Sequence, residues 1–103
     1  MTKQKPEAFR FAEALGEGVD LAFKNIASEI LSDGALSAKE KALIAVACSV
    51  AIRCENCIKV NEERALETGA SREEILEAGA VAGLVRLGSS FTSAAVLLDD
   101  LER

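Results

Sequence analysis

Two cysteines, Cys54 and Cys57, are separated by two residues and are the side chains of this sequence best suited to chemistry. Thiols at this spacing can close a disulfide and open it again when the backbone holds them in the first turn of a helix. On a helix, Cys54, Cys57 and Asn61 lie at positions i, i+3 and i+7 of one face. We therefore predict Cys54 and Cys57 as catalytic residues, supported by Asn61 as a neutral hydrogen-bond donor to a sulfur.

The order of the two thiols follows from the expected start of the helix. A helix that begins at Cys54 places this sulfur beside unpaired backbone N–H groups at the positive end of the helix dipole, which stabilises a thiolate. Arg53 and Lys59 act in the same direction, and Glu55 opposes them. We expect Cys54 to attack a disulfide or sulfenic acid and Cys57 to resolve the mixed disulfide; the order reverses if Cys57 is the more exposed sulfur.

Metal binding is the main alternative for this pair. A structural zinc site needs four Cys or His ligands, and the chain has three cysteines and no histidine. A four-cysteine site shared between subunits therefore remains open, as does an inert pair of core cysteines. Cys48 lies in an apolar segment and is interpreted as a small buried hydrophobe. We predict neither a metal nor a cofactor.

Composition predicts a single helical domain that associates with itself. The 103 residues suit one domain, 1–103. Half of the residues are hydrophobic but only four are aromatic, so the core must consist of Ala, Leu, Val and Ile. The surplus of apolar side chains predicts that some are buried between subunits.

Charge and hydropathy restrict the class of partner and the compartment. The net charge of −5 comes without a basic patch, which argues against nucleic acid. The apolar run Ala42–Ile52 has 11 residues, whereas a bilayer requires about 20. The N-terminal stretch has no signal-peptide core. We expect a cytoplasmic protein with no membrane partner, and in that compartment a CxxC pair is more often catalytic or metal-binding than structural.

The spacing of apolar residues predicts helices throughout. One long helix is expected over about 6–31, weakened at Gly16 and Gly18. A capping box, Ser37 with Glu40, begins the next helix. Because this second helix is apolar on all sides, it should be the central one.

The rest of the chain continues the helical pattern. A third helix is expected from about Cys54 to Gly69, and a second capping box, Ser71 with Glu74, begins a fourth. The segment Gly88-Ser89-Ser90 should interrupt the fourth helix before a last one that begins at Phe91. No segment alternates as a half-buried strand does. The predicted architecture is all-α, with four or five helices.

Residues 36–85 resemble the core of the carboxymuconolactone decarboxylase and AhpD-like alkylhydroperoxidase family. The motifs that carry the resemblance are Leu36-Ser37-Ala38-Lys39, Cys54, Cys57, Ala65, Gly69 and Ser71 to Glu74. The resemblance implies an AhpD-like helical fold, homotrimers or homohexamers, and thiol–disulfide chemistry that supports peroxide reduction. It also implies a peroxiredoxin, a thioredoxin-like protein or another dithiol as partner.

Two positions depart from the family pattern. The family's proton relay uses a glutamate and a histidine, and these positions hold Ala42 and Asn61 here. A thiolate stabilised at a helix N-terminus needs no base for disulfide exchange, so the departures weaken direct peroxidase activity more than exchange. They weaken lyase chemistry of the decarboxylase type further, because no histidine remains to transfer a proton.

The sequence thus favours an enzyme: a CxxC thiol–disulfide oxidoreductase that supports peroxide detoxification or protein disulfide reduction, and so serves an antioxidant role. The alternative is a non-catalytic redox-sensing or assembly protein on the same fold. A decarboxylase-type lyase is the third possibility.

Overall fold

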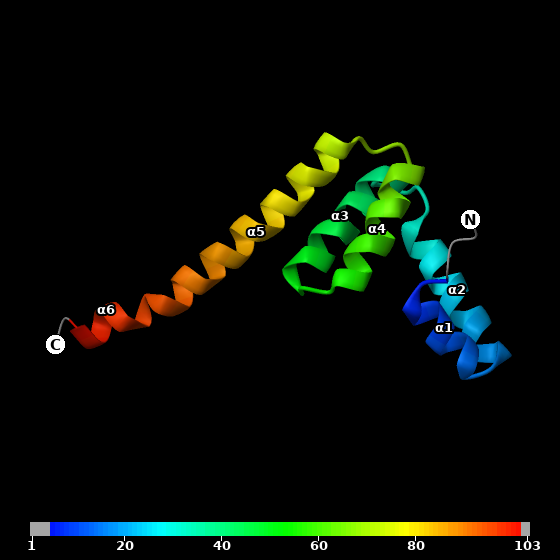
Figure 1. Ribbon diagram of the computed structural model, residues 1–103, viewed down its shortest axis with the longest axis horizontal. Helices are drawn as coiled ribbons and strands as arrows, with labels where there is room; N and C mark the ends of the chain where they lie inside the picture. Colours follow the sequence, from blue (N-terminus) through cyan, green and yellow to red (C-terminus); the bar gives the residue numbers. More distant parts are fainter. Residues whose placement is uncertain (1–4, 102–103) are drawn as a thin grey trace.

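The computed structural model describes residues 5–101, which are helical apart from short connections (Figure 1). The helices are α1 (Glu7–Ala14), α2 (Glu17–Leu31), α3 (Ala38–Ala51), α4 (Glu55–Glu67), α5 (Arg72–Ala94) and α6 (Val96–Leu101). The described residues contain no strand. The prediction of an all-α protein is confirmed.

Helix α3 lies at the centre of the arrangement. It packs against both α4 and α5, and it also touches α2. Helices α1 and α2 form a hairpin on one side, while α5 and α6 form a rod whose C-terminal half extends away from the other helices (Figure 1). The molecule is therefore elongated, with extents of 60 × 33 × 31 Å. The predicted central position of the apolar helix is confirmed.

The core between α3, α4 and α5 is built from small side chains. Its buried members are Ala42, Val46, Ala65 and Ala70, and Leu43 and Ile75 pack against them. None of the larger side chains among the described residues is completely buried. Small side chains allow the helix backbones to approach closely, but they bury little apolar surface per residue. This core is consequently thin for a chain of this length.

The two predicted capping boxes are confirmed, and they start α3 and α5. The Glu40 N–H donates to Ser37 Oγ at 3.0 Å, and the Ser37 N–H donates to Glu40 Oε1 at 2.9 Å. Ser71 and Glu74 repeat the arrangement at 3.1 and 2.8 Å. Lys39 Nζ then lies 2.8 Å from Glu74 Oε2. This ion pair joins the first turns of α3 and α5.

The single N-terminal helix expected over 6–31 is two helices. The chain breaks at Gly16, whose φ of 120° lies in the left-handed region that only glycine adopts easily. α2 folds back along α1, and the rings of Phe9 and Phe23 meet edge to face with centroids 4.9 Å apart. The predicted weak point is therefore a turn.

The interruption expected at Gly88-Ser89-Ser90 is wrong, because α5 continues through it to Ala94. Each Gly or Ser lowers helix propensity by only about 0.5–1 kcal/mol, which neighbouring residues can offset. Only Ala95 separates α5 from α6, and its backbone is itself in the α region. The last helix thus begins at Val96 rather than at Phe91.

The span Arg72–Asp99, which takes in α5 and most of α6, is long and apolar enough to cross a membrane by length and composition, and 6% of its apolar window is buried. Core helices of soluble proteins can pass the same test. The prediction of no membrane partner was based on the apolar run Ala42–Ile52. The rod formed by α5 and α6 is a longer apolar segment than that run. That expectation remains a prediction.

Candidate redox site

Cys54 and Cys57 form a disulfide at the start of α4, with an Sγ–Sγ distance of 2.08 Å. Both residues are half-buried. The structure thus brings together the two sulfurs predicted to react. They lie at the connection between α3 and α4, the two helices of the central hairpin.

A tight connection positions the first sulfur. α3 ends at its C-cap Ile52, and Arg53 then adopts a φ of 58°, the only positive φ of a non-glycine among the described residues. The Cys54 N–H donates to the Ser49 carbonyl oxygen at 3.1 Å. This bond ties the connection to the last turn of α3, so that the backbone at Cys54 has little freedom.

Cys54 is the N-cap of α4, so the helix begins where the sequence predicted, near Cys54. The backbone N–H of Cys57 donates to Cys54 Sγ at 3.2 Å. A side chain at this position satisfies an N–H group of the first turn and lies at the positive end of the helix dipole. The same contacts would stabilise a thiolate on Cys54 once the disulfide is opened.

Asn61 is held by two side chains one turn further along α4. Its Nδ2 donates to Ser49 Oγ at 2.9 Å, and its Oδ1 accepts from Arg64 Nη1 at 2.6 Å. Ser49 Oγ in turn donates to the Ala45 carbonyl oxygen at 2.7 Å. In the described structure the amide is therefore bonded to Ser49 and Arg64. Donation from Asn61 to a sulfur stays a prediction.

Ser49 and Arg64 were not among the predicted site residues. Ser49 is 3% exposed and is the one buried polar residue among those described. It holds both Cys54, through its carbonyl, and Asn61, through its hydroxyl. The signal for it was present, because Ser49 is the only hydroxyl within the otherwise apolar run Ala42–Ile52. Its partner twelve residues later could not be read from spacing.

The interpretation of Cys48 as a buried hydrophobe is wrong. Cys48 is a free and exposed cysteine. It lies four residues after Ile44, which is itself 49% exposed, on a face of α3 that the other helices of this chain do not cover. Within residues 5–101, no three His, Cys, Asp or Glu side chains gather closely enough to hold a metal ion.

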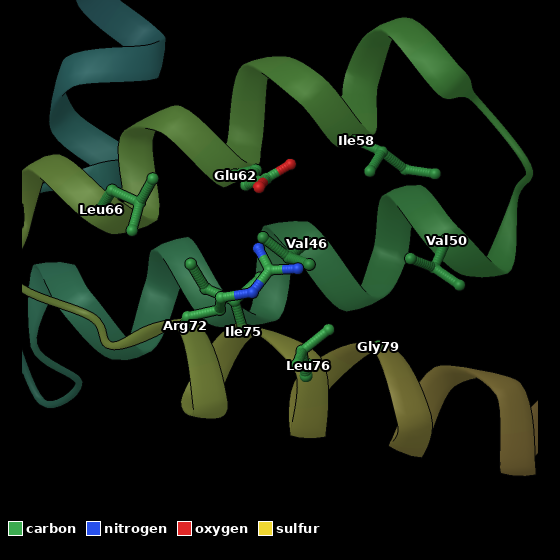
Figure 2. A pocket seen from close by; sticks show the side chains of 9 residues that line it. All are labelled: Val46, Val50, Ile58, Glu62, Leu66, Arg72, Ile75, Leu76 and Gly79. Carbon is green, nitrogen blue, oxygen red and sulfur yellow. The ribbon is translucent and has the colours of Figure 1, made fainter.

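An apolar groove of about 630 Å³ lies between α3, α4 and α5 (Figure 2). Val50 and Ile58 line one end of it, and Ile58 directly follows Cys57. Figure 2 shows the Arg72 side chain from α5 reaching over the groove toward Glu62 of α4. Neither sulfur lines the groove. It ends beside the disulfide rather than on it.

The family model described as "Carboxymuconolactone decarboxylase family" matches residues 17–100, which include the whole of this site. The chain belongs to the carboxymuconolactone decarboxylase family. The family expected from the sequence motifs is thus confirmed, together with its all-helical fold.

Relatives of this family member include solved structures. A crystal structure from Methanobacterium thermoautotrophicum shares 45% identity and a TM-score of 0.78, and the match covers 88% of this chain and 98% of that one. A Thermotoga maritima protein shares 29% identity and a TM-score of 0.67, over 95% and 91% of the two chains.

Two curated relatives are named as uncharacterised proteins. A Paracoccus denitrificans protein, "Uncharacterized protein 4 in cox locus", is 34% identical over 90 residues, which cover 84% of this chain and 81% of its own. A Cupriavidus necator protein is 37% identical over 60 residues, 58% of this chain and about half of its own length (53%). These names assign no activity.

The two departures from the family's proton relay have structural counterparts. Ala42 is completely buried at the centre of the small core. Its methyl group contacts apolar neighbours where the family pattern has a glutamate. Asn61 occupies the histidine position and is engaged with Ser49 and Arg64. Neither side chain can take up and release a proton at neutral pH, because an alanine and an amide do not titrate.

Proposed function

We propose that this protein is a thiol–disulfide oxidoreductase whose reactive groups are Cys54 and Cys57. The observation that carries the proposal is the capped disulfide, in which Cys54 Sγ accepts the Cys57 N–H at the first turn of α4. Membership of the carboxymuconolactone decarboxylase family supports it, since the CxxC pair belongs to the family motif that this chain keeps.

The reaction begins from the reduced protein. The Cys54 thiolate attacks one sulfur of a substrate disulfide, forms a mixed disulfide and releases the other substrate sulfur as a thiolate, which takes up a proton. Cys57 loses its proton and attacks Cys54 Sγ, which releases the second substrate thiolate and forms the Cys54–Cys57 disulfide. Two electrons have then passed to the substrate. An external dithiol supplies two electrons to the protein by reducing the Cys54–Cys57 disulfide through the same kind of exchange.

The partners follow from this chemistry. The reductant would be a dithiol or thioredoxin-like protein, and the oxidised substrate a protein disulfide, including that of a peroxiredoxin in a peroxide-removing system. A reducing compartment such as the cytoplasm suits a disulfide that must be reopened in each cycle. Direct peroxide reduction would lack a proton relay, because Ala42 and Asn61 occupy the two positions that supply it in the family pattern.

The test is reduction of a peptide disulfide with dithiothreitol as the reductant. Cys54→Ser should abolish turnover. Cys57→Ser, reduced beforehand and then mixed with the peptide disulfide without dithiothreitol, should stop at a mixed disulfide between Cys54 and the peptide, visible as an added mass. Cys48→Ser is the matched control, because it removes the exposed third thiol and should leave turnover unchanged. Activity that survives in both Cys54→Ser and Cys57→Ser would refute the proposal.

The same assay separates a catalyst from a redox sensor. A catalyst should convert many equivalents of the peptide disulfide for each protein molecule while dithiothreitol remains. A sensor should change its own redox state once and then stop. A single turnover in excess reductant would favour the non-catalytic alternative.

A further inference from the structure

Ser49 holds the start of α4 at two points. Its carbonyl oxygen accepts the Cys54 N–H at 3.1 Å, and its hydroxyl oxygen accepts a hydrogen bond from Asn61 Nδ2 at 2.9 Å. Cys54 is the N-cap of α4 and Asn61 lies about two turns further along, so Cys57 lies between the two attached residues. Ser49 is buried, where hydrogen bonds are electrostatically stronger than in water. One residue of α3 thus fixes the segment that carries both sulfurs.

The first attachment is part of the cap that ends α3. The Arg53 N–H donates to the Val50 carbonyl oxygen at 3.0 Å, one step inside the bond between the Cys54 N–H and the Ser49 carbonyl. Together with the left-handed backbone of Arg53, these two bonds form the Schellman motif that ends many helices. Cys54 therefore belongs to the end of α3 and to the start of α4. The backbone of the first cysteine is held by both helices.

The second attachment is a chain of hydrogen bonds that crosses from α3 to α4. Ser49 Oγ gives its only hydrogen to the Ala45 carbonyl oxygen at 2.7 Å, so toward Asn61 it acts as an acceptor. Asn61 Oδ1 accepts from Arg64 Nη1 at 2.6 Å, which orients the amide with its Nδ2 toward the hydroxyl. Because each group is fixed as donor or acceptor, the chain resists sliding or rotation of α4 against α3.

We propose that Ser49 is a positioning residue for the Cys54–Cys57 pair and that its hydroxyl makes the disulfide harder to reduce. This inference rests on the proposed function, in which the pair opens and closes in each cycle. After reduction, the attachments at Cys54 and Asn61 keep the two thiols near the geometry of the closed pair. Thiols that are held together close again more readily, because less conformational freedom is lost on closure.

The N-terminus of α4 acts in the opposite direction. The Cys57 N–H stabilises a thiolate on Cys54, and this favours the reduced pair. That bond lies within the first turn of α4 and does not involve Ser49. Removal of the Ser49 hydroxyl should therefore weaken closure while the stabilisation of the thiolate remains. The pair should become more oxidising.

The experiment equilibrates the protein with mixtures of reduced and oxidised glutathione, in a Cys48→Ser background that leaves only the two thiols of the pair. Two glutathione molecules reduce the disulfide to two thiols and leave as one oxidised glutathione. Alkylation followed by mass measurement gives the closed fraction. We expect Ser49→Ala to lower the equilibrium constant for closure about three- to ten-fold, a potential about 15–30 mV more positive. The fraction that carries a mixed disulfide with glutathione should rise.

Two further variants separate positioning from a loss of stability. Asn61→Ala removes the same bond from the other side, so Asn61→Ala and the double variant should both match Ser49→Ala. Gly69→Ala is the matched control, because it strains the left-handed backbone at the end of α4 far from both cysteines. Destabilisation that is equal in the oxidised and reduced states does not change the potential. Gly69→Ala should therefore keep the native equilibrium constant.

Three results would overturn the positioning role: an unchanged equilibrium constant in Ser49→Ala, shifts that add in the double variant, or an equal shift in Gly69→Ala. If Ser49→Ala does not fold, Asn61→Ala decides the question against the same control, because its side chain is only half-buried. The measurement requires no turnover. A native protein that equilibrates with glutathione but fails to reduce the peptide disulfide would refute the proposed function alone, whereas normal turnover with equal potentials would refute only the role of Ser49.

Discussion

Arg53 and Gly69 adopt similar left-handed backbone conformations just outside the two ends of α4, with φ of 58° and 94°. Glycine accepts this conformation freely, whereas a residue with a side chain is strained by about 1–2 kcal/mol. The chain thus places glycine at one end of the helix and tolerates an arginine at the end that carries the disulfide.

Exchanging the residue types at these positions should have opposite effects. Arg53→Gly should raise the free energy of unfolding by about 0.5 kcal/mol, because the relief of strain exceeds the added entropy of the unfolded chain. Gly69→Ala should lower it by about 1 kcal/mol, although a Cβ there would meet no atom within 4 Å. Urea unfolding of the oxidised protein measures both. A destabilised Arg53→Gly variant would mean that the arginine side chain contributes more than its backbone strain costs.

The bond between Ser49 and Asn61 should be the most sensitive polar contact near the disulfide. Ser49→Ala removes a buried hydroxyl and leaves the Asn61 amide without its partner on α3, which should cost about 1–2 kcal/mol. A double-mutant cycle with Asn61→Ala should give a coupling energy of about 1 kcal/mol.

The control for this cycle is Thr92→Ala, which removes an exposed hydroxyl that also bonds to a carbonyl one turn earlier. It should cost nothing measurable. Additive effects of Ser49→Ala and Asn61→Ala, with no coupling, would show that the observed contact carries no stability.

At the scale of helices, the first turns of α3 and α5 depend on carboxylates. The Lys39 ammonium, followed by the Ser71 N–H, holds the pKa of Glu74 below its ordinary value of 4.5. The Ser37 N–H and then its hydroxyl lower the pKa of Glu40 in the same way. Because both pKa values are depressed on folding, this stabilisation is fully present above pH 4.5 and is lost as the pH falls through the lowered values.

Glu74→Gln isolates the effect of the charge, because an amide can still accept the Ser71 N–H. Near pH 7 the variant should melt about 1–3 °C below the native protein. The difference should shrink as the pH falls below about 4, where the native carboxyl also becomes neutral. Glu73→Gln, which removes a charge from the exposed neighbouring residue, should show a smaller difference. A difference in melting temperature between Glu74→Gln and the native protein that stays the same at all pH values would contradict a stabilising role for the Glu74 charge.

Local signals in the sequence predicted the helix starts better than they predicted the breaks. Ser37 and Ser71 cap through residues three positions away, so short-range spacing suffices to find them. Positions 16 and 88 are both glycine, yet only Gly16 separates two helices. A turn at Gly16 lets α2 fold back along α1. Such an outcome depends on contacts between distant residues that periodicity does not contain.

In the candidate site too, local motifs predicted some residues, whereas others depend on how the helices pack. The positions of Cys54 and Cys57 at the start of α4 follow from the motif and the expected cap. The role of Ser49 depends on the crossing of α3 and α4, and the exposure of Cys48 depends on which face of α3 the other helices cover. Apolar pattern alone places α3 centrally but does not show that one of its faces stays open.

At the scale of the whole molecule, the core is thin and the large apolar side chains of α5 and α6 are exposed. The core is mostly alanine and contributes little burial per helix, while the exposed side chains of α5 and α6 include leucines and Phe91. We therefore expect the melting temperature of the native protein to rise with protein concentration, by several degrees over a hundred-fold range. The melting temperature of Leu87→Glu/Phe91→Glu should be lower and independent of concentration. A native melting temperature that does not respond to concentration would contradict an obligate assembly.

The cap at Cys54 has a consequence for how this protein would take part in signalling. The Cys57 N–H already binds Cys54 Sγ while the disulfide is closed, and a thiolate on Cys54 could keep the same bond. Oxidised and reduced molecules should then present nearly the same outline to a neighbour, with circular dichroism that is indistinguishable between the two states. A partner that recognises shape would gain no information from the redox state. Such a protein is suited to transferring electrons by disulfide exchange and poorly suited to acting as a redox sensor for a binding partner.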